Sequence, residues 1–413
     1  MSDTRPVPPA ERIERIDVLR GFALLGILPV NLVMMKAPAS LRWSGAELYS
    51  GPFDDFIRGL IAMLFEGKFY PLFAMLFGVG LVMQGERLAA RGDPPRRRLA
   101  RRLAVLAGIG AAHAFGIWFG DILLTYALLG FVTLALFPVK RALLRVLAVL
   151  GIVGVPLAMA GLIGGALAVG AVSPEWRAEI DAQAVEAREE SVEDLAEARA
   201  AYGSGSVGEI LARNAQDVRA VYSYAWVWAP TVLGWILLGL DIGRSGLLAD
   251  LGAHDAALRR AFRVLLPIGL IAGAVYAFAN HLTPAPGPSP AYVVFQLASA
   301  IGAPALVLAY GIAVMVRFDD PRWRPRLAPL APFGRMALTN YLLQSIMCVT
   351  LLYAPGFGLY ERLSPAAGLL LAAAIVAIQI PLSGWWLRRF RFGPAEWLWR
   401  ALTYGTVPQM RQR

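Results

Sequence analysis

Residues 18–37, VLRGFALLGILPVNLVMMKA, form a run of 20 mostly apolar residues close to the start of the chain. A helix needs about 20 such residues to cross a bilayer. The residues before Ile16 are polar and no A-x-A exit follows the run, so we predict a retained helix and not a cleaved signal peptide. Comparable apolar runs recur at 56–84, 99–119, 122–139, 142–172, 220–243, 261–281, 292–316, 330–354 and 366–387. The sequence therefore predicts an all-α polytopic membrane protein of about ten transmembrane helices.

The composition points to the same class. Hydrophobic residues make up 57% of the 413 residues and charged residues 16%, whereas a soluble domain carries about 25% charged residues. This excludes a soluble globular enzyme, a disordered chain and a fibrous protein. The net charge is +10, but the arginines fall between the apolar runs, as in loops that face anionic lipid. We therefore expect membrane lipid, and no nucleic acid, as a partner.

Cysteine and histidine are rare in this sequence. Cys348 is the single cysteine and lies inside an apolar run, so neither a disulfide framework nor a cysteine metal site is expected. The three histidines, His113, His254 and His281, are not spaced as metal ligands, and we predict no metal site.

The distribution of arginine and lysine predicts the orientation. With the N-terminus inside, the inner loops hold 28 basic residues and the outer loops hold 9. Because basic residues concentrate on the cytoplasmic side, this split predicts ten spans with both termini cytoplasmic.

One hydrophilic segment, 173–219, divides the chain into an N-terminal membrane half, 1–172, and a C-terminal membrane half, 220–413, each with about five spans. The segment is rich in Ala and Glu and begins with a helix start signal at Ser173-Pro174, so we predict an external helical loop. Two apolar runs are longer than one straight helix requires. In 142–172, Pro156 and several glycines predict a kinked or broken helix.

Ionisable residues inside apolar runs are functional candidates, because each costs free energy in a bilayer. Asp17, Arg20 and Asn31 lie on nearly the same face of the first helix, and they predict a polar stripe that enters the membrane from the cytoplasmic edge. An Asp–Arg pair at the headgroups, with an asparagine that joins helices, explains the same pattern.

Glu66 and Lys68 flank Gly67 in the overlong second run, and Pro71 follows. This pattern predicts a discontinuous helix whose second half could hold an anion at its N-terminus beside Lys68. The alternative is a simple Glu–Lys pair at the outer interface.

His113 is the only histidine well inside an apolar run, and histidine is the side chain best suited to proton transfer near neutral pH. Asp121 follows in a minimal turn, where it could orient His113 or cap the next helix. Arg335 starts the helix of the ninth run from the inside and is a further candidate for substrate binding. Asn340 and Gln344 lie four residues apart on one face of this helix, where such amides either line a polar cavity or hold helices together.

These motifs together resemble the YeiB family of bacterial inner-membrane proteins, over essentially the whole chain. The resemblance rests on Asp17-x-x-Arg20-Gly21 with Asn31, Glu66-Gly-Lys-Phe69, His113 with Trp118-Phe-Gly-Asp121-Ile-Leu, Gly334-Arg-Met-Ala-Leu-Thr-Asn-Tyr341 and Gly393-Pro-x-Glu-Trp-Leu-Trp-Arg400. The N-terminal half is also similar to that of the heparan-α-glucosaminide N-acetyltransferases and, more distantly, the type-3 transmembrane acyltransferases. This implies a bacterial inner-membrane location and transfer of an acyl group from cytoplasmic acyl-CoA to a small-molecule or glycan acceptor.

The resemblance implies roles for the candidate residues. Arg20 and Lys68 would bind the phosphates or thioester region of acyl-CoA, a co-substrate and not a permanently bound cofactor. The type-3 enzymes carry Arg-x10-His in their first helix, whereas Arg20 is followed here by Asn31, which cannot act as a base. Either His113 supplies the base, with Asp121 orienting it, or this branch does not transfer acyl groups. The second hypothesis is a secondary transporter or flippase, since intramembrane charges and broken helices are also typical of carriers. A homo-oligomer is left open by the sequence.

Overall fold

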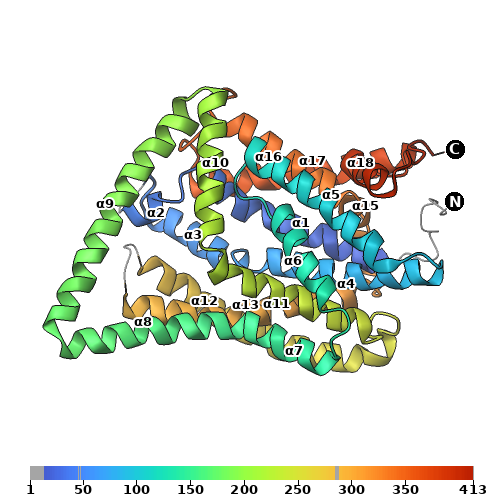
Figure 1. Cartoon of the computed structure of the whole chain (residues 1–413), viewed down its shortest axis with the longest axis horizontal. Coiled ribbons are helices and arrows are strands. Elements are labelled where there is room, and N and C mark those ends of the chain that lie inside the picture. The colour runs from blue at the N-terminus through green and yellow to red at the C-terminus, as the bar shows by residue number, and fades with distance from the viewer. Residues whose placement is uncertain (1–13, 45, 47, 284–287, 413) are drawn as a thin grey trace.

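The computed structural model describes residues 14–412 apart from 45, 47 and 284–287, and Figure 1 shows its helices. Over these residues the chain is helical, and its β-structure is limited to an isolated bridge between Phe390 and Arg411. The α-helices are α1 (Glu14–Met35), α2 (Leu41–Ser44), α3 (Pro52–Leu64), α4 (Phe69–Ala90), α5 (Pro95–Gly116), α6 (Leu123–Ala135), α7 (Arg141–Val149), α8 (Val155–Val172), α9 (Pro174–Ser204), α10 (Val207–Ser223), α11 (Ala225–Arg244), α12 (Asp255–His281), α13 (Pro290–Arg317), α14 (Arg324–Leu327), α15 (Leu330–Arg335), α16 (Ala337–Leu352), α17 (Pro365–Arg389) and α18 (Pro394–Tyr404). A π-helical segment, η2 (Leu150–Gly154), joins α7 to α8, and a 3-10 turn, η3 (Gly252–His254), precedes α12.

The helices confirm an all-α polytopic membrane protein. Each of the ten predicted apolar runs coincides with one helix or with two consecutive helices. Within the described ranges, seven helical segments are long and apolar enough to cross a membrane, counting α3 with α4 and α7 with α8 as single segments. The shorter α6 and α16 are apolar as well. The 22-residue α5 begins with several arginines before its apolar part.

The predicted break in the second run is present. α3 ends at Leu64, α4 begins at Phe69, and Gly67 between them has φ +72°, a conformation that favours glycine. The last carbonyls of α3 find donors at the break, because the Lys68 ammonium donates to Ala62 O at 2.7 Å and the Tyr310 hydroxyl donates to Leu64 O at 3.1 Å.

The run 142–172, for which the sequence predicted a kinked or broken helix, is not broken but contains an irregular π-helical segment, η2. α7, η2 and α8 form one continuous helical segment, in which Pro156 lies in the first turn of α8. Proline has no backbone N–H and therefore cannot donate to the preceding turn. A π turn is wider than an α turn, so the helix continues past Pro156 although this hydrogen bond is missing. Within this segment the Gly151 carbonyl accepts a hydrogen bond from the Thr231 hydroxyl of α11 at 3.0 Å.

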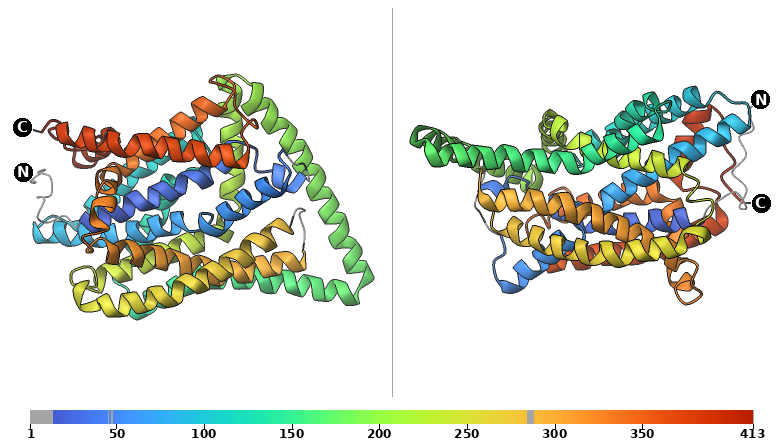
Figure 2. Two further views of the ribbon diagram at one scale, coloured as in Figure 1. Left: turned by 180° about the vertical axis from the view of Figure 1, so that it is seen from behind. Right: turned by 90° about the horizontal axis from the view of Figure 1, so that it is seen from below.

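The hydrophilic segment forms two helices, α9 and α10, as the helical-loop prediction required. Figures 1 and 2 show α9 running along one end of the bundle, opposite to α18. Ser173 caps α9 by accepting from the Trp176 amide at 3.3 Å, and α10 begins with a capping box of Ser206 and Glu209.

An ion cluster around the buried Arg213 holds these two helices together. The Arg213 guanidinium lies 2.5 Å from Asp194 on α9 and 2.9 Å from Asp217 on α10. Burial raises the pKa of the Asp217 carboxyl, which also accepts from the Tyr202 hydroxyl at 2.5 Å. The pair α9 and α10 is therefore a fixed cap over that end of the bundle.

At the other end, α1 and α15 approach each other backbone to backbone. A Cβ on Gly334 would lie 1.9 Å from Asp17 O, and one on Gly21 would lie 2.3 Å from Leu330 O. Only glycine fits both positions, so the Asp17-x-x-Arg20-Gly21 and Gly334-Arg335 motifs are in direct contact. This brings Arg20 and Arg335 to the same end of the bundle, which we call the arginine-rich end.

Candidate active site

A cavity of ≈340 Å³ opens at the arginine-rich end, between α1, α4, α5, α16 and α18. Of the described residues that line it, eight are arginines and two are carboxylates, Asp17 and Glu396. The arginines are Arg20, Arg87, Arg91, Arg98, Arg102, Arg335, Arg391 and Arg400. The lining therefore carries an excess of six positive charges, which suits a ligand with several negative charges.

Both carboxylates are engaged within the protein. Asp17 lies 3.0 Å from the Arg20 guanidinium. Glu396, on α18, accepts from the backbone amides of Leu338 at 2.7 Å and Thr339 at 3.1 Å, and from the Thr339 hydroxyl at 2.5 Å. These amides belong to the first turn of α16, so Glu396 caps that helix from a neighbouring element. The lining therefore keeps a net positive charge beside two carboxylates that already have partners.

The inner part of the cavity is apolar and aromatic. Its lining includes Leu24, Ile27, Phe73, Phe77, Leu106, Leu123, Tyr126 and Tyr341. The Tyr126 hydroxyl donates to Tyr70 O at 2.6 Å, which fixes the ring against Phe73 and Phe77. The cavity thus combines a cationic mouth with an apolar interior, a pattern that fits an amphipathic anion.

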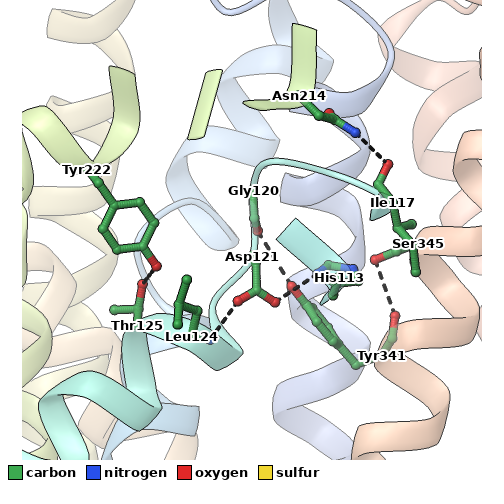
Figure 3. A network of polar contacts seen from close by, with 10 residues as sticks. All are labelled: His113, Ile117, Gly120, Asp121, Leu124, Thr125, Asn214, Tyr222, Tyr341 and Ser345. Atoms are coloured by element: carbon green, nitrogen blue, oxygen red, sulfur yellow. Dashed lines mark hydrogen bonds and ion pairs between the residues drawn. The ribbon is translucent and has the colours of Figure 1, made fainter. Parts of the chain in front are cut away.

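Next to this interior, the turn between α5 and α6 brings His113 and Asp121 together, as Figure 3 shows. His113 Nδ1 lies 2.8 Å from Asp121 Oδ2, and both side chains are buried. Asp121 Oδ1 accepts from the Leu124 amide at 2.6 Å. The two predicted roles of Asp121, orienting the histidine and capping α6, are therefore combined in one carboxylate.

The second ring nitrogen of His113, Nε2, is the one at which a proton could be transferred. Its Nε2 is buried without a hydrogen-bond partner among the described residues. Tyr341 separates His113 from the cavity: it lines the cavity, and its ring centroid lies 5.1 Å from that of His113. Sequence reasoning missed Tyr341 and Tyr126, because a tyrosine inside an apolar run carries no signal that separates a cavity wall from the core.

Of the three candidates of the C-terminal half, Asn340 and Gln344 hold helices together. Asn340 donates to Phe333 O at 3.1 Å and to the Ser383 hydroxyl at 2.9 Å. Gln344 donates to the Gln379 side chain at 2.9 Å, and Gln379 donates to Asn340 O at 3.1 Å. Among these candidates only Arg335 lines the cavity.

Glu66 and Lys68 lie elsewhere. They line a separate cavity of ≈60 Å³ that shares no lining residue with the first. The Lys68 ammonium lies 4.5 Å from the Tyr276 ring centroid, and the Tyr276 hydroxyl donates to Glu66 at 3.0 Å. The structure therefore does not bring Lys68 to Arg20. Asn31, half-buried on α1, lines neither cavity.

The cap closes the site at the end opposite to the arginines. Asn214 on α10 donates to Ile117 O at 3.2 Å, and the hydroxyls of Tyr222 and Thr125 lie 3.0 Å apart (Figure 3). The described lining therefore opens toward the arginine-rich end, while the His113–Asp121 pair lies under α10.

Comparison with known proteins identifies the family. The chain is 33% identical to YxaH of Bacillus subtilis (strain 168) over 98% of its length and 97% of that protein. It is 32% identical to YeiB of Escherichia coli (strain K12) over 95% of its length and 96% of that protein. The chain belongs to the YeiB family.

A family model described as a protein of unknown function (DUF418) matches residues 242–406. In this YeiB-family chain the matched segment includes α18 and the first turn of α16, which form one wall of the cavity. No solved structure matches the chain significantly. Among the residues that the structure describes, no three His, Cys, Asp or Glu side chains gather to hold a metal ion.

Proposed function

We propose that this protein is an integral membrane acyltransferase that uses a CoA thioester as donor and His113 as general base. The observation that supports the proposal most directly is a cavity that leads from eight arginines to the wall in front of the His113–Asp121 pair. CoA has the matching polarity, since its phosphates lie at one end and its thioester at the other.

The dimensions agree with this assignment. Arg102 and His113 are eleven residues apart on α5, which at 1.5 Å per residue is roughly 16 Å. The pantetheine arm of CoA has about a dozen bonds and extends over roughly 15 Å. Phosphates bound at Arg102 would therefore place the thioester near the depth of His113, beside Tyr341.

The geometry of the His113–Asp121 pair supports a separate role for each ring nitrogen of His113. Asp121 accepts the Nδ1 hydrogen of His113, which leaves Nε2 as the acceptor of a proton. His113 would take the proton from a hydroxyl or amine of the acceptor as that atom attacks the thioester carbonyl. The new bond joins the acceptor to the acyl carbon, the carbon–sulfur bond breaks, and the CoA sulfur leaves with the proton that His113 held.

We also propose that the arginine-rich end faces the cytoplasm of a bacterial cell and that both termini lie there. The excess of basic residues in the loops of this end supports it. The donor would then enter from the compartment that contains acyl-CoA, and the arginines would attract it.

The test uses the purified full-length protein with acetyl-CoA and a panel of amino sugars and sugar alcohols, and it measures release of the CoA thiol. His113→Gln should lower turnover about 10²- to 10⁴-fold, the usual contribution of a positioned base, without loss of donor binding. Equal rates for His113→Gln and wild type would exclude this mechanism.

A carrier is the second candidate, because the chain breaks between α3 and α4 and Glu66 and Lys68 line a small cavity at the break, as charged residues do in transporters. Thermal stabilisation of the protein by CoA thioesters would favour the enzyme. Stabilisation by free solutes alone would favour the carrier.

A further inference from the structure

The short helix α18 forms part of the mouth of the arginine cavity. Glu396 ties its first turn to α16, and its following turns line the mouth of the arginine cavity with Trp399, Arg400 and Tyr404. On the other side of the mouth, α5 contributes Arg98 and Arg102.

Pairs of guanidinium groups and aromatic rings lie at the mouth, and two of them, Arg102 with Trp399 and Arg98 with Tyr404, join α5 to α18. The Arg102 guanidinium lies 3.6 Å from the Trp399 ring centroid, and the Trp399 indole N–H donates to Arg102 O at 2.9 Å. Arg400 lies 4.6 Å from the Phe392 ring and Arg98 lies 5.9 Å from the Tyr404 ring. A guanidinium that lies over an indole still has N–H groups at its edge, which can bind a phosphate in a bidentate manner.

The groups at this mouth can recognise features of a ligand other than its negative charge. Inorganic anions or lipid headgroups would need only the arginines, whereas planar guanidinium and aromatic surfaces also stack nucleobases. Three such pairs at one cavity mouth, together with the charge excess, match a ligand that carries both phosphates and a base.

We propose that α18 and the first turns of α5 form a nucleotide subsite, which binds the adenosine 3′,5′-bisphosphate end of the donor. This assignment rests on the proposed use of acyl-CoA and adds the part of the chain that recognises the nucleotide. It also accounts for the packing of a short amphipathic helix against the membrane bundle through the Glu396 carboxylate.

The experiment measures binding of adenosine 3′,5′-bisphosphate to the purified full-length protein in detergent by calorimetry, with adenosine monophosphate and pyrophosphate as comparisons. Loss of one charge-assisted phosphate contact or one stacked base costs about 10- to 100-fold in affinity. Arg102→Ala and Trp399→Leu should therefore raise the Kd by that factor. Arg102→Lys and Trp399→Phe cover the case in which the larger changes prevent folding, and each should raise the Kd at least several-fold.

A matched control exists in the same protein. Arg389 lies 4.4 Å from the Trp385 ring on α17, and neither residue lines the cavity. Arg389→Ala and Trp385→Leu remove an equivalent guanidinium–indole pair and should change the Kd less than twofold. A loss of affinity in the control variants as large as in the α18 variants would overturn the subsite.

The remaining outcomes distinguish a nucleotide from other phosphate-bearing ligands. They also distinguish failure of the nucleotide subsite from failure of the proposed acyltransferase function. Equal displacement by pyrophosphate, or by mixed micelles of anionic phospholipid, would make the mouth a general anion or headgroup site and overturn the nucleotide assignment. Absence of bisphosphate binding in a protein that still transfers acyl groups from acyl-CoA would overturn the subsite and leave the proposed function intact. Specific bisphosphate binding without acyl transfer would support the subsite and contradict the proposed function.

Discussion

The substitution Asp121→Asn separates catalysis from stability at the candidate active site. In the wild type, Oδ1 accepts from the Leu124 amide at 2.6 Å and Oδ2 accepts from His113 Nδ1 at 2.8 Å. Asparagine can keep the first contact with its carbonyl oxygen, so the cap of α6 remains. Its amide group would then donate to His113 Nδ1, which moves the imidazole hydrogen to Nε2 and removes the proton acceptor.

The magnitude follows from these two contacts. Loss of a positioned general base lowers turnover by about 10²–10⁴, or roughly 2.7–5.4 kcal/mol in activation free energy. Stability should change little in Asp121→Asn because both hydrogen bonds persist. Asp121→Ala, in contrast, loses the cap and leaves a buried imidazole donor unpaired, which costs about 2–4 kcal/mol in the free energy of unfolding.

The assay follows thiol release from acetyl-CoA, donor binding and thermal unfolding for the wild type and both variants. Cys348 is buried, so the protein itself adds little thiol signal. The expected result is an Asn variant that is folded, binds the donor and is inactive. An Asn variant with wild-type turnover would refute the assignment of the base, and an Asn variant as unstable as the Ala variant would show a purely structural role for Asp121.

Three further outcomes are expected from the packing and the charge distribution. Gly334→Ala should destabilise the protein by about 1–3 kcal/mol, because the added Cβ would meet Asp17 O at 1.9 Å; Gly384→Ala, with open space around it, should be close to neutral in thermal unfolding. Lys68→Met should cost about 1.5–3 kcal/mol in unfolding free energy through the lost hydrogen bond to Ala62 O, and unchanged stability would contradict its role in closing the helix break. Cysteines at Gly92 and Gly203 should react with a membrane-impermeant thiol reagent from the inside and the outside respectively, and the reverse pattern would contradict the proposed orientation.

Sequence alone determined the fold class and several of the positions at which helices begin, end or break. In a membrane the backbone N–H and C=O groups of a long apolar run must form their hydrogen bonds within the protein, and a run of about 20 residues does so as a helix. The all-α architecture therefore followed from composition and run length. The break at Gly67, the start of α9 at Ser173 and the turn before Asp121 were also readable, because each depends on local backbone chemistry. The pairing of His113 with Asp121 was within reach for the same reason, since only eight residues separate them.

Tertiary structure decided which polar residues share a site. Arg20 and Lys68 both stand in apolar runs near the N-terminus, yet they line different cavities, and Asn340 and Gln344 bond between α16 and α17 away from the arginine cavity. The cavity wall formed by Tyr341 and α18 joins residues that are far from His113 in sequence. Local sequence fixes where a helix begins and ends, but the rotation and neighbours of each helix depend on close contacts such as Gly334 against Asp17 O, and those are set by packing across the whole chain.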